Sequence, residues 1–520
     1  MKYRLGCILI LLSFLCVCTS CGNESSYADL AAIGEEDGRE VGNGFPEYVY
    51  DQQRVQFLNG VPSMAIAESG YYYTMKNRLY FYNIDSDQNT LLCSRVNCGH
   101  DSAECDAFVY TCYSPLEYGG GASCNCFAKR ILYYDGSLYM IERTEEGDYF
   151  LYRYNSGFGN REKVLELASL EDGQVSVSSA DACVIRDGYF YYVGLVYDPD
   201  YVQKEYMGTF QCRRVKLEKD AEPEVLGEFE YGADYAMAMG ESSGIRIFVV
   251  GEDIYYVAGG TGRAYTTSNP VQYRVLKYHT GSGEFTMLWS YTGTETADLW
   301  GEGTGNADRM SRGNYICMDE SGNLYIMTVS DEKKSYYEKM NSSTNPDSIV
   351  RFNPEKGTSE VIYTASRDYI DEMVCDGEYL YFFESYEEGG SCLRGVDTNG
   401  SVAAEMELEY TESYQELYST FAEHYRSAFP DKKIGQITVG GGNVKIYGVD
   451  DRYILLACRN DAGVFQNLAA ADMDYDDEAG EGSDIAGVGV IDKQSFLRGE
   501  DCGIRQIYQR QSTSVGSEEE

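Results

Sequence analysis

The fold of this chain is indicated most clearly by residues 130–167, which read RILYYDGSLYMIERTEEGDYFLYRYNSGFGNREKVLEL. The Asp135-Gly136 pair supplies the positive φ of a tight hairpin turn, and the runs on either side alternate apolar and polar residues. One charged turn and one glycine-rich turn separate two further runs of the same kind. The stretch therefore predicts four short antiparallel strands, at 130–134, 137–142, 149–154 and 163–167.

The same phrase, a turn pair followed closely by Tyr, recurs seven times at intervals of roughly 50 to 70 residues. A four-stranded sheet of this size cannot bury both faces alone, so the units must stack, and a closed ring also protects their edges. We expect an all-β fold, a β-propeller with seven four-stranded blades. Six or eight blades remain alternatives, and residues 48–57 are a candidate for the closing strand. The turn pairs are Ser69-Gly70, Asp135-Gly136, Asp187-Gly188, Glu252-Asp253, Ser321-Gly322, Asp376-Gly377 and Asp450-Asp451.

Continuous repetition argues for one ring rather than several domains. The helical insertion is expected because Ser413 and Glu416 form a capping box and apolar residues follow at helical spacing. The expected organisation is a signal peptide (1–20), a flexible tether (21–45), a single propeller (46–510) and a disordered tail (511–520), with a Cys-rich insertion (93–126), a helical insertion (409–434) and an acidic loop (471–484).

The N-terminus predicts export and a lipid anchor. Lys2 and Arg4 precede an apolar run over residues 6–18 that is too short to remain as a spanning helix. The sequence Cys18-Thr-Ser-Cys21 that follows resembles a bacterial lipobox, in which the last Cys is lipidated. Acyl chains on Cys21 would hold the protein at the outer face of the bacterial cytoplasmic membrane. Cleavage without lipidation is the alternative.

The formal net charge of −42 argues against nucleic acid as a partner, because no basic stripe offsets it. Asp472, Asp474 and Asp476 alternate as in a calcium loop. However, Asp477 occupies the position of the usual Gly, and Ser483 that of the bidentate Glu. A solvated acidic insertion is therefore the favoured interpretation, with a bound cation as the alternative.

Six of the 17 cysteines crowd between the first and second predicted blades. In an exported chain, disulfides that staple a long loop are the favoured interpretation. The alternative is a structural zinc site formed by Cys93, Cys98, His100 and Cys105, which would have four protein ligands and hence no open position for catalysis. The six cysteines are Cys93, Cys98, Cys105, Cys112, Cys124 and Cys126.

The lipobox, the Tyr-rich repeats and the segment Asn97-Cys98-x-His100-Asp101-x3-Cys105 together resemble a family of uncharacterised cell-surface lipoproteins of anaerobic Gram-positive bacteria. That family carries a TolB-like propeller of unknown function. The resemblance covers most of the chain and implies location and fold. It implies no reaction.

No nucleophile elbow, phosphate loop or zinc-protease helix is present in the sequence, and no catalytic residue is assigned. Trp300, Tyr336 and Tyr337 lie in predicted inter-blade loops, where aromatic rings could contact a ligand or simply pack the loop. We therefore expect a binding or interaction scaffold for a protein or glycan at the cell surface. The alternative is a carbohydrate-active enzyme, a glycosidase or lyase, that uses loop carboxylates. No cofactor is expected beyond a structural zinc or calcium ion.

Overall fold

The structure is a computed structural model. It describes residues 52, 64–75, 78–95, 97–100, 105–107, 131–143, 149–154, 161–168, 175–177, 183–197, 206–232, 245–261, 271–293, 316–328, 330, 346–385, 391–408, 444–459 and 485–509.

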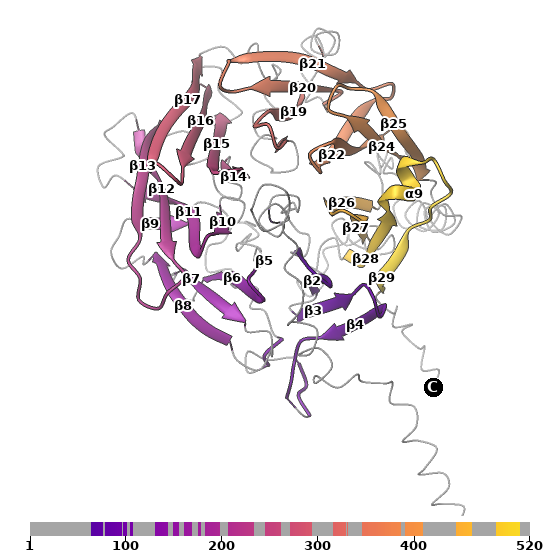
Figure 1. Cartoon of the computed structure of the whole chain (residues 1–520), viewed down its shortest axis with the longest axis horizontal. Coiled ribbons are helices and arrows are strands. Elements are labelled where there is room, and N and C mark those ends of the chain that lie inside the picture. Colours follow the sequence, from indigo (N-terminus) through magenta and orange to yellow (C-terminus); the bar gives the residue numbers. More distant parts are fainter. Residues whose placement is uncertain are drawn as a thin grey trace, which may run out of the picture.

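The described strands form seven antiparallel sheets arranged in a ring, which confirms the seven-bladed propeller (Figure 1). Each sheet uses strands that follow one another in sequence, with the first strand nearest the axis and the last at the rim. The blades are β1(Met64–Ala67), β2(Gly70–Met75), β3(Arg78–Asn83), β4(Gln88–Leu91); β5(Ile131–Tyr134), β6(Ser137–Arg143), β7(Tyr149–Tyr154), β8(Arg161–Ala168); β10(Cys183–Arg186), β11(Tyr189–Tyr197), β12(Tyr206–Lys216), β13(Glu224–Gly232); β14(Ile245–Val250), β15(Asp253–Thr261), β16(Val271–His279), β17(Glu284–Gly293); β18(Ile316–Met318), β19(Leu324–Thr328), β20(Ser348–Asn353), β21(Thr358–Thr364); β22(Tyr369–Cys375), β23(Tyr379–Ser385), β24(Ser391–Asp397), β25(Val402–Leu408); and β26(Val444–Val449), β27(Tyr453–Arg459), β28(Ile485–Asp492), β29(Arg505–Gln509).

Two details depart from a uniform ring. The third blade has a fifth strand, β9 (Val175–Val177), which pairs with β11. The last blade carries the short helix α9 (Lys493–Leu497) between its third and fourth strands, and the Asp492 carboxylate accepts the Ser495 N–H to cap it. Within the described residues, no helix has the length and apolar character needed to cross a membrane.

The repeated turn pair lies between the first and second strand of every blade, as the sequence predicts. Asp135 and Gly136 have φ values of 47° and 68°, the conformation that a two-residue hairpin turn requires at both positions. In two blades, the Tyr that follows in the second strand stabilises the turn through its hydroxyl group. The Tyr325 hydroxyl donates to Asp319 and the Tyr381 hydroxyl donates to Asp376, both at 2.9 Å. Each of these tyrosines therefore fills the blade with its ring and anchors the preceding turn with its hydroxyl.

The apolar core is divided among the spaces between blades. Among the described residues, seven large clusters of buried residues each combine side chains of two neighbouring blades. One of them joins the first blade to the last, where Met64 and Tyr73 pack with Leu455 and Val490. Since every blade shares both of its faces, the ring is closed by the same packing that builds it.

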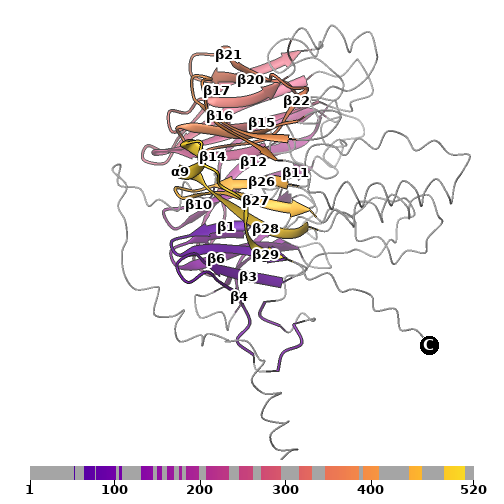
Figure 2. The same cartoon turned by 90° about the vertical axis from the view of Figure 1, so that its right-hand side faces the viewer.

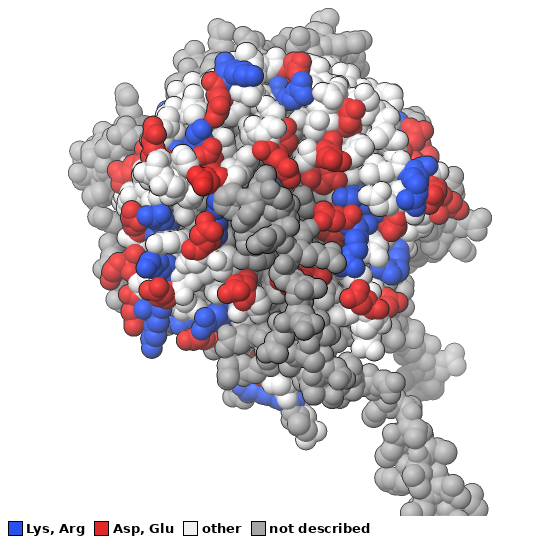
Figure 3. Space-filling model, viewed as in Figure 1, with Lys and Arg blue, Asp and Glu red and all other residues white. Residues whose placement is uncertain are grey.

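The two faces of the ring differ in their connections, because the strands of each sheet alternate in direction. The turns between first and second strands and between third and fourth strands lie together at one face, here called the turn face, where α9 also lies (Figure 2). At the opposite face, here called the loop face, lie the ends of the strands that are joined by the connections from second to third strands and from each blade to the next. Figure 3 shows acidic side chains recurring over one face of the ring, several near its centre.

Within 48–57, the structure describes only Gln52, and the prediction that this residue belongs to a ring-closing strand is wrong. The first and last blades are each complete with four consecutive strands. Gln52 instead binds the innermost strand of the third blade: its side chain donates to the Ile185 carbonyl at 2.9 Å and accepts the Ile185 N–H at 2.8 Å. It satisfies two groups on the inner edge of β10 because an innermost strand has no neighbour there.

Candidate metal centre

The chain returns to the first blade after β4, before it reaches the second. The Leu92 N–H donates to the Leu79 carbonyl at 3.0 Å, and the Leu79 N–H donates to the Ala107 carbonyl at 2.8 Å. Leu79, Leu92 and Ala107 are fully buried. Both ends of the segment between Leu92 and Ala107 are therefore held on the same residue of β3.

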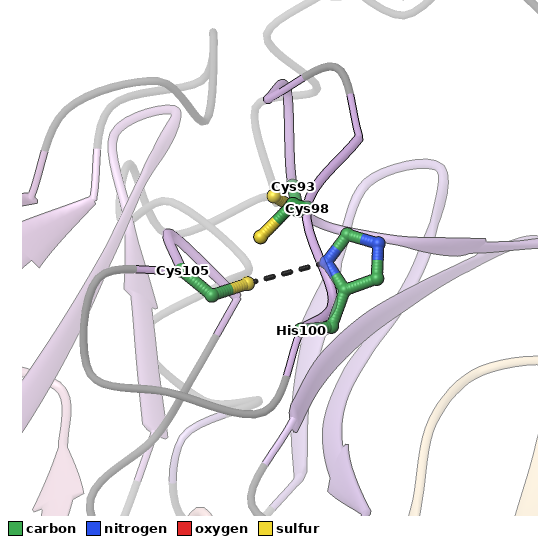
Figure 4. A group of neighbouring side chains, drawn as sticks. All are labelled: Cys93, Cys98, His100 and Cys105. Atoms are coloured by element: carbon green, nitrogen blue, oxygen red, sulfur yellow. Dashed lines mark hydrogen bonds between the residues drawn. The ribbon is translucent and has the colours of Figure 1, made fainter.

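Four potential ligands converge between these two anchor points. The side-chain donor atoms of Cys93, Cys98, His100 and Cys105 all lie within 4.8 Å of one another. His100 Nδ1 lies 3.3 Å from Cys105 Sγ, and Figure 4 shows the sulfur atoms and the ring directed toward one another. Cys93 and Cys105 are buried, whereas Cys98 and His100 are partly exposed.

The backbone turns that bring these residues together use left-handed conformations. Asn97 has φ 61° and His100 has φ 57°, a region that L-residues enter rarely and that Asn and His enter more readily than most. The Arg78 guanidinium donates from Nε to the His100 carbonyl at 2.9 Å. This bond fixes the peptide that carries the imidazole.

The thiols of Cys98 and Cys105 differ in acidity. The backbone N–H of His100 hydrogen-bonds to Cys98 Sγ and lowers the pKa of that thiol. Burial raises the pKa of the Cys105 thiol to about 12, although a hydrogen bond from the Ala107 backbone acts in the opposite direction. Without a bound cation, Cys105 is therefore a neutral buried thiol at neutral pH.

The disulfides favoured by the sequence are not formed among the described cysteines. Cys93, Cys98 and Cys105 are free thiols, as are the other six described cysteines. The sulfur atoms of Cys93, Cys98 and Cys105 instead lie together with a ring nitrogen of His100, all within 4.8 Å of one another. Cys112, Cys124 and Cys126 lie outside the described residues, so their pairing stays a prediction.

The other sequence candidates also lie outside the described part of the chain. This holds for the lipidation residue Cys21 with the signal peptide and tether, for the aromatic loop residues, for the acidic loop and for the helical and C-terminal segments. The residues concerned are Trp300, Tyr336, Tyr337, Asp472, Asp474, Asp476, 409–434 and 511–520. Their assignments stay predictions.

Glu372 and Glu384 are among the buried carboxylates that the sequence analysis missed. Glu372 lies at a bulge in β22 with φ 52°; it pairs with Lys445 and accepts the Ile446 N–H at 2.8 Å. Glu384, in β23, accepts from the Tyr363 hydroxyl at 2.5 Å and from Arg394 Nε at 3.0 Å. Because these partners come from neighbouring strands or blades, both carboxylates hold the ring together.

A signal for Glu372 was present in the sequence. Asp371 and Glu372 interrupt an otherwise apolar strand, and two adjacent carboxylates cannot both follow the two-residue alternation of a half-buried strand. An extra residue at this point predicts a bulge. The partner Lys445 belongs to the next blade and could be identified only from the fold.

No protein-family model matches the sequence, and no curated protein does. Solved structures with detectable similarity include an ulvan lyase of a new polysaccharide lyase family, with 12% identity, 81% of this chain and 92% of that chain covered, and a TM-score of 0.41. TolB from Acinetobacter baumannii matches with 11% identity over 70% of this chain and 65% of that chain, at a TM-score of 0.28. Puromycin hydrolase matches with 11% identity over 72% of this chain and 49% of that chain, at a TM-score of 0.34. The chain thus spans about half the length of the hydrolase, and these similarities carry no argument about activity.

Proposed function

We propose that this protein is a lipid-anchored, extracytoplasmic propeller that binds a protein or glycan through its loop face. Cys21 would carry the anchor, and the propeller would present its loops to the cell exterior. The observation that carries this proposal is the unequal length of the connections at the two faces.

At the turn face, the connections between described strands are short in six blades. The longest one, 493–504 in the last blade, contains α9. At the loop face, five connections are much longer, between 19 and 39 residues, although others, such as 76–77 and 365–368, are as short as the turns. Insertions are tolerated where they leave the strand ladders intact, and rigid scaffolds carry binding residues on such loops. The longest of these connections are 92–130, 294–315, 329–347, 409–443 and 460–484.

The aromatic candidates belong to these connections. In the sequence, Trp300 falls within 294–315, and Tyr336 and Tyr337 fall within 329–347; the described strands that flank both stretches end at the loop face. The other tryptophan, Trp289, is on the outer strand β17, where its ring packs edge-on against Phe352 at a centroid distance of 5.0 Å. Trp289 is therefore used for packing between blades, which leaves Trp300 as the tryptophan to test for binding.

The test is a binding screen of the full chain, solubilised in detergent, against arrays of cell-wall and host glycans and against extracytoplasmic proteins. We expect saturable binding without products, lost or at least about tenfold weaker in Trp300→Ala or Tyr336→Ala/Tyr337→Ala, because a buried aromatic contact contributes about 1–3 kcal/mol. Lys356→Ala, on the turn face, is the matched control and should bind as the wild type does. Cleavage of a glycan would show that the protein is a carbohydrate-active enzyme instead. Loss of binding only in Lys356→Ala would place the ligand on the turn face and contradict the proposal.

The lipid anchor is tested in bacterial cells that express the full chain. Cys21→Ala should move the protein from the membrane fraction to the soluble fraction and abolish incorporation of a labelled fatty acid. Cys16→Ala should change neither. Labelling that survives in Cys21→Ala contradicts the proposed anchor.

A further inference from the structure

We propose that Cys93, Cys98, His100 and Cys105 bind one Zn²⁺ ion as a closed, four-ligand structural site on the first blade. This inference is independent of what the loop face binds. It rests on the convergence of the four side chains, on the backbone that holds them and on the chemistry of the donor set.

The geometry is close to that of a tetrahedral zinc ion. Zinc binds cysteine sulfur at about 2.3 Å and histidine nitrogen at about 2.0–2.1 Å, which places neighbouring donor atoms about 3.5–3.8 Å apart. Here His100 Nδ1 and Cys105 Sγ are 3.3 Å apart, and no pair of donor atoms in the group exceeds 4.8 Å. Small side-chain movements of the partly exposed Cys98 and His100 complete the tetrahedron.

The donor set favours zinc over other metals. Three thiolates and one imidazole are soft or borderline ligands, whereas calcium and magnesium require oxygen. The four protein ligands fill a tetrahedron and leave no position for water, so the site holds structure rather than activating a nucleophile. Zinc also undergoes no redox change, which suits a site at the cell exterior.

The backbone around the site provides the secondary contacts that zinc sites use. Cys98 Sγ accepts the N–H of His100 and Cys105 Sγ accepts the N–H of Ala107, in each case the residue two positions later. Such bonds stabilise the thiolates that ligate the metal. Three thiolates and Zn²⁺ leave one net negative charge, and the positively charged Arg95 belongs to the same segment, two residues after Cys93. Arg95 also pairs with Asp106 at 3.3 Å, so it connects the two arms of the segment.

The segment needs a cross-link because its own core is small. Cys93, Cys105 and Ala107 form a cluster of only three buried residues, against which Leu91 and Cys98 pack. Two of these three are ligands, so a metal would convert a sparse apolar contact into a fixed joint. The joint lies at the start of connection 92–130 and would set the direction in which that connection leaves the blade.

The test is metal analysis of the full chain, purified in detergent without chelators. We expect one zinc per chain in the wild type. Zinc affinity should fall by more than about 100-fold in Cys105→Ser and His100→Ala, since second-shell changes alone cost about 10–100-fold. Cys502→Ser is the matched control, because Cys502 is a partly exposed thiol on the last blade, and it should retain the metal.

A readout that does not depend on the folding of variants uses the wild type alone. After chelation, Co²⁺ should restore one equivalent of metal with the sulfur charge-transfer and visible bands of a tetrahedral thiolate site, and zinc should bleach them. Non-reducing peptide mapping should find Cys93, Cys98 and Cys105 as free thiols. A disulfide between any two of them, an octahedral cobalt spectrum, or equal zinc content in Cys105→Ser and wild type would overturn the proposal.

Discussion

Glu372 is a carboxyl group buried in the inner wall of the ring. Burial raises the pKa of its carboxyl to about 7, and the Lys445 ammonium partly opposes this shift. The left-handed backbone at Glu372 costs conformational energy that Lys445 and the Ile446 N–H offset. The residue is therefore held by its partners in the neighbouring blade rather than by local preference.

The raised pKa of Glu372 predicts a specific pH dependence of folding. Since the folded pKa lies above the ordinary value of 4.5, the contribution of Glu372 to stability is fully present below pH 4.5 and is lost as pH rises through about 7. The free energy of unfolding of the wild type, minus that of Glu372→Gln, should therefore fall by about 3 kcal/mol across this window.

Urea denaturation at half-unit pH intervals measures this difference. Glu407→Gln is the control, because the hydrogen bond from Arg367 lowers the pKa of Glu407 and its carboxylate stays ionised above pH 5 in both states. The control difference should be flat between pH 5 and 7.5. A flat difference for Glu372→Gln as well would contradict a raised pKa.

At the scale of the element, each blade depends on turns whose backbone excludes most side chains. Gly136 has φ 68° with open space around its Cα, so only the backbone demands glycine there. Gly400, between β24 and β25, has φ 93°, and a Cβ at this position would lie 1.9 Å from the Ile362 carbonyl oxygen of the previous blade. The first glycine shapes a hairpin, and the second also permits two blades to approach.

The two glycines predict different losses of stability. Gly136→Ala should lower the free energy of unfolding by about 1 kcal/mol through backbone strain alone. Gly400→Ala should lower it by about 3 kcal/mol or more, because the clash is with backbone that cannot rotate away. Gly503→Ala, where a Cβ meets nothing, should change it by less than about 0.5 kcal/mol. Denaturant unfolding of the three variants checks this order, and equal effects at 136 and 400 would refute it.

At the scale of the whole molecule, the ring is closed by contacts between its first and last blades. The Tyr71 hydroxyl donates to Asp450 at 2.5 Å, and Asp450 also accepts the Arg452 N–H at 2.7 Å within its own turn. The apolar cluster shared by these blades surrounds Tyr71. Closure therefore combines side-chain packing with a buried hydrogen bond to a carboxylate.

Removing this single hydroxyl should weaken the closed ring measurably. Tyr71→Phe should lower the free energy of unfolding by about 2 kcal/mol, because a hydrogen bond to a charged group contributes about 1.5–3 kcal/mol. The matched control is Tyr82→Phe, in the same blade, whose hydroxyl donates to the exposed Asp87 and should cost about 1 kcal/mol or less. Chemical denaturation measures both, and an equal cost for both variants would show that closure does not use this bond.

Much of the fold could be predicted because its determinants are local. Asp135-Gly136 and its counterparts specify turns within four residues, and the two-residue alternation specifies the strands between them. The candidate site was only partly predictable. Cys93, Cys98, His100 and Cys105 are close in sequence, so their grouping was visible, but their geometry depends on both ends of the segment binding Leu79. Glu372 with Lys445 and Tyr71 with Asp450 were invisible, because they join residues from different blades.

The amino-acid sequence by itself determined the four-stranded repeat and the positions of its turns, since short-range backbone preference and burial periodicity act within each repeat; it favoured seven blades, and the structure fixed that number. Only the tertiary structure decided that Gln52 binds the third blade instead of closing the ring, and that three cysteine sulfurs converge with a histidine nitrogen instead of pairing. The first outcome depends on the contact of Gln52 with Ile185, and the second on both ends of the segment binding Leu79. No local pattern in the chain records either contact.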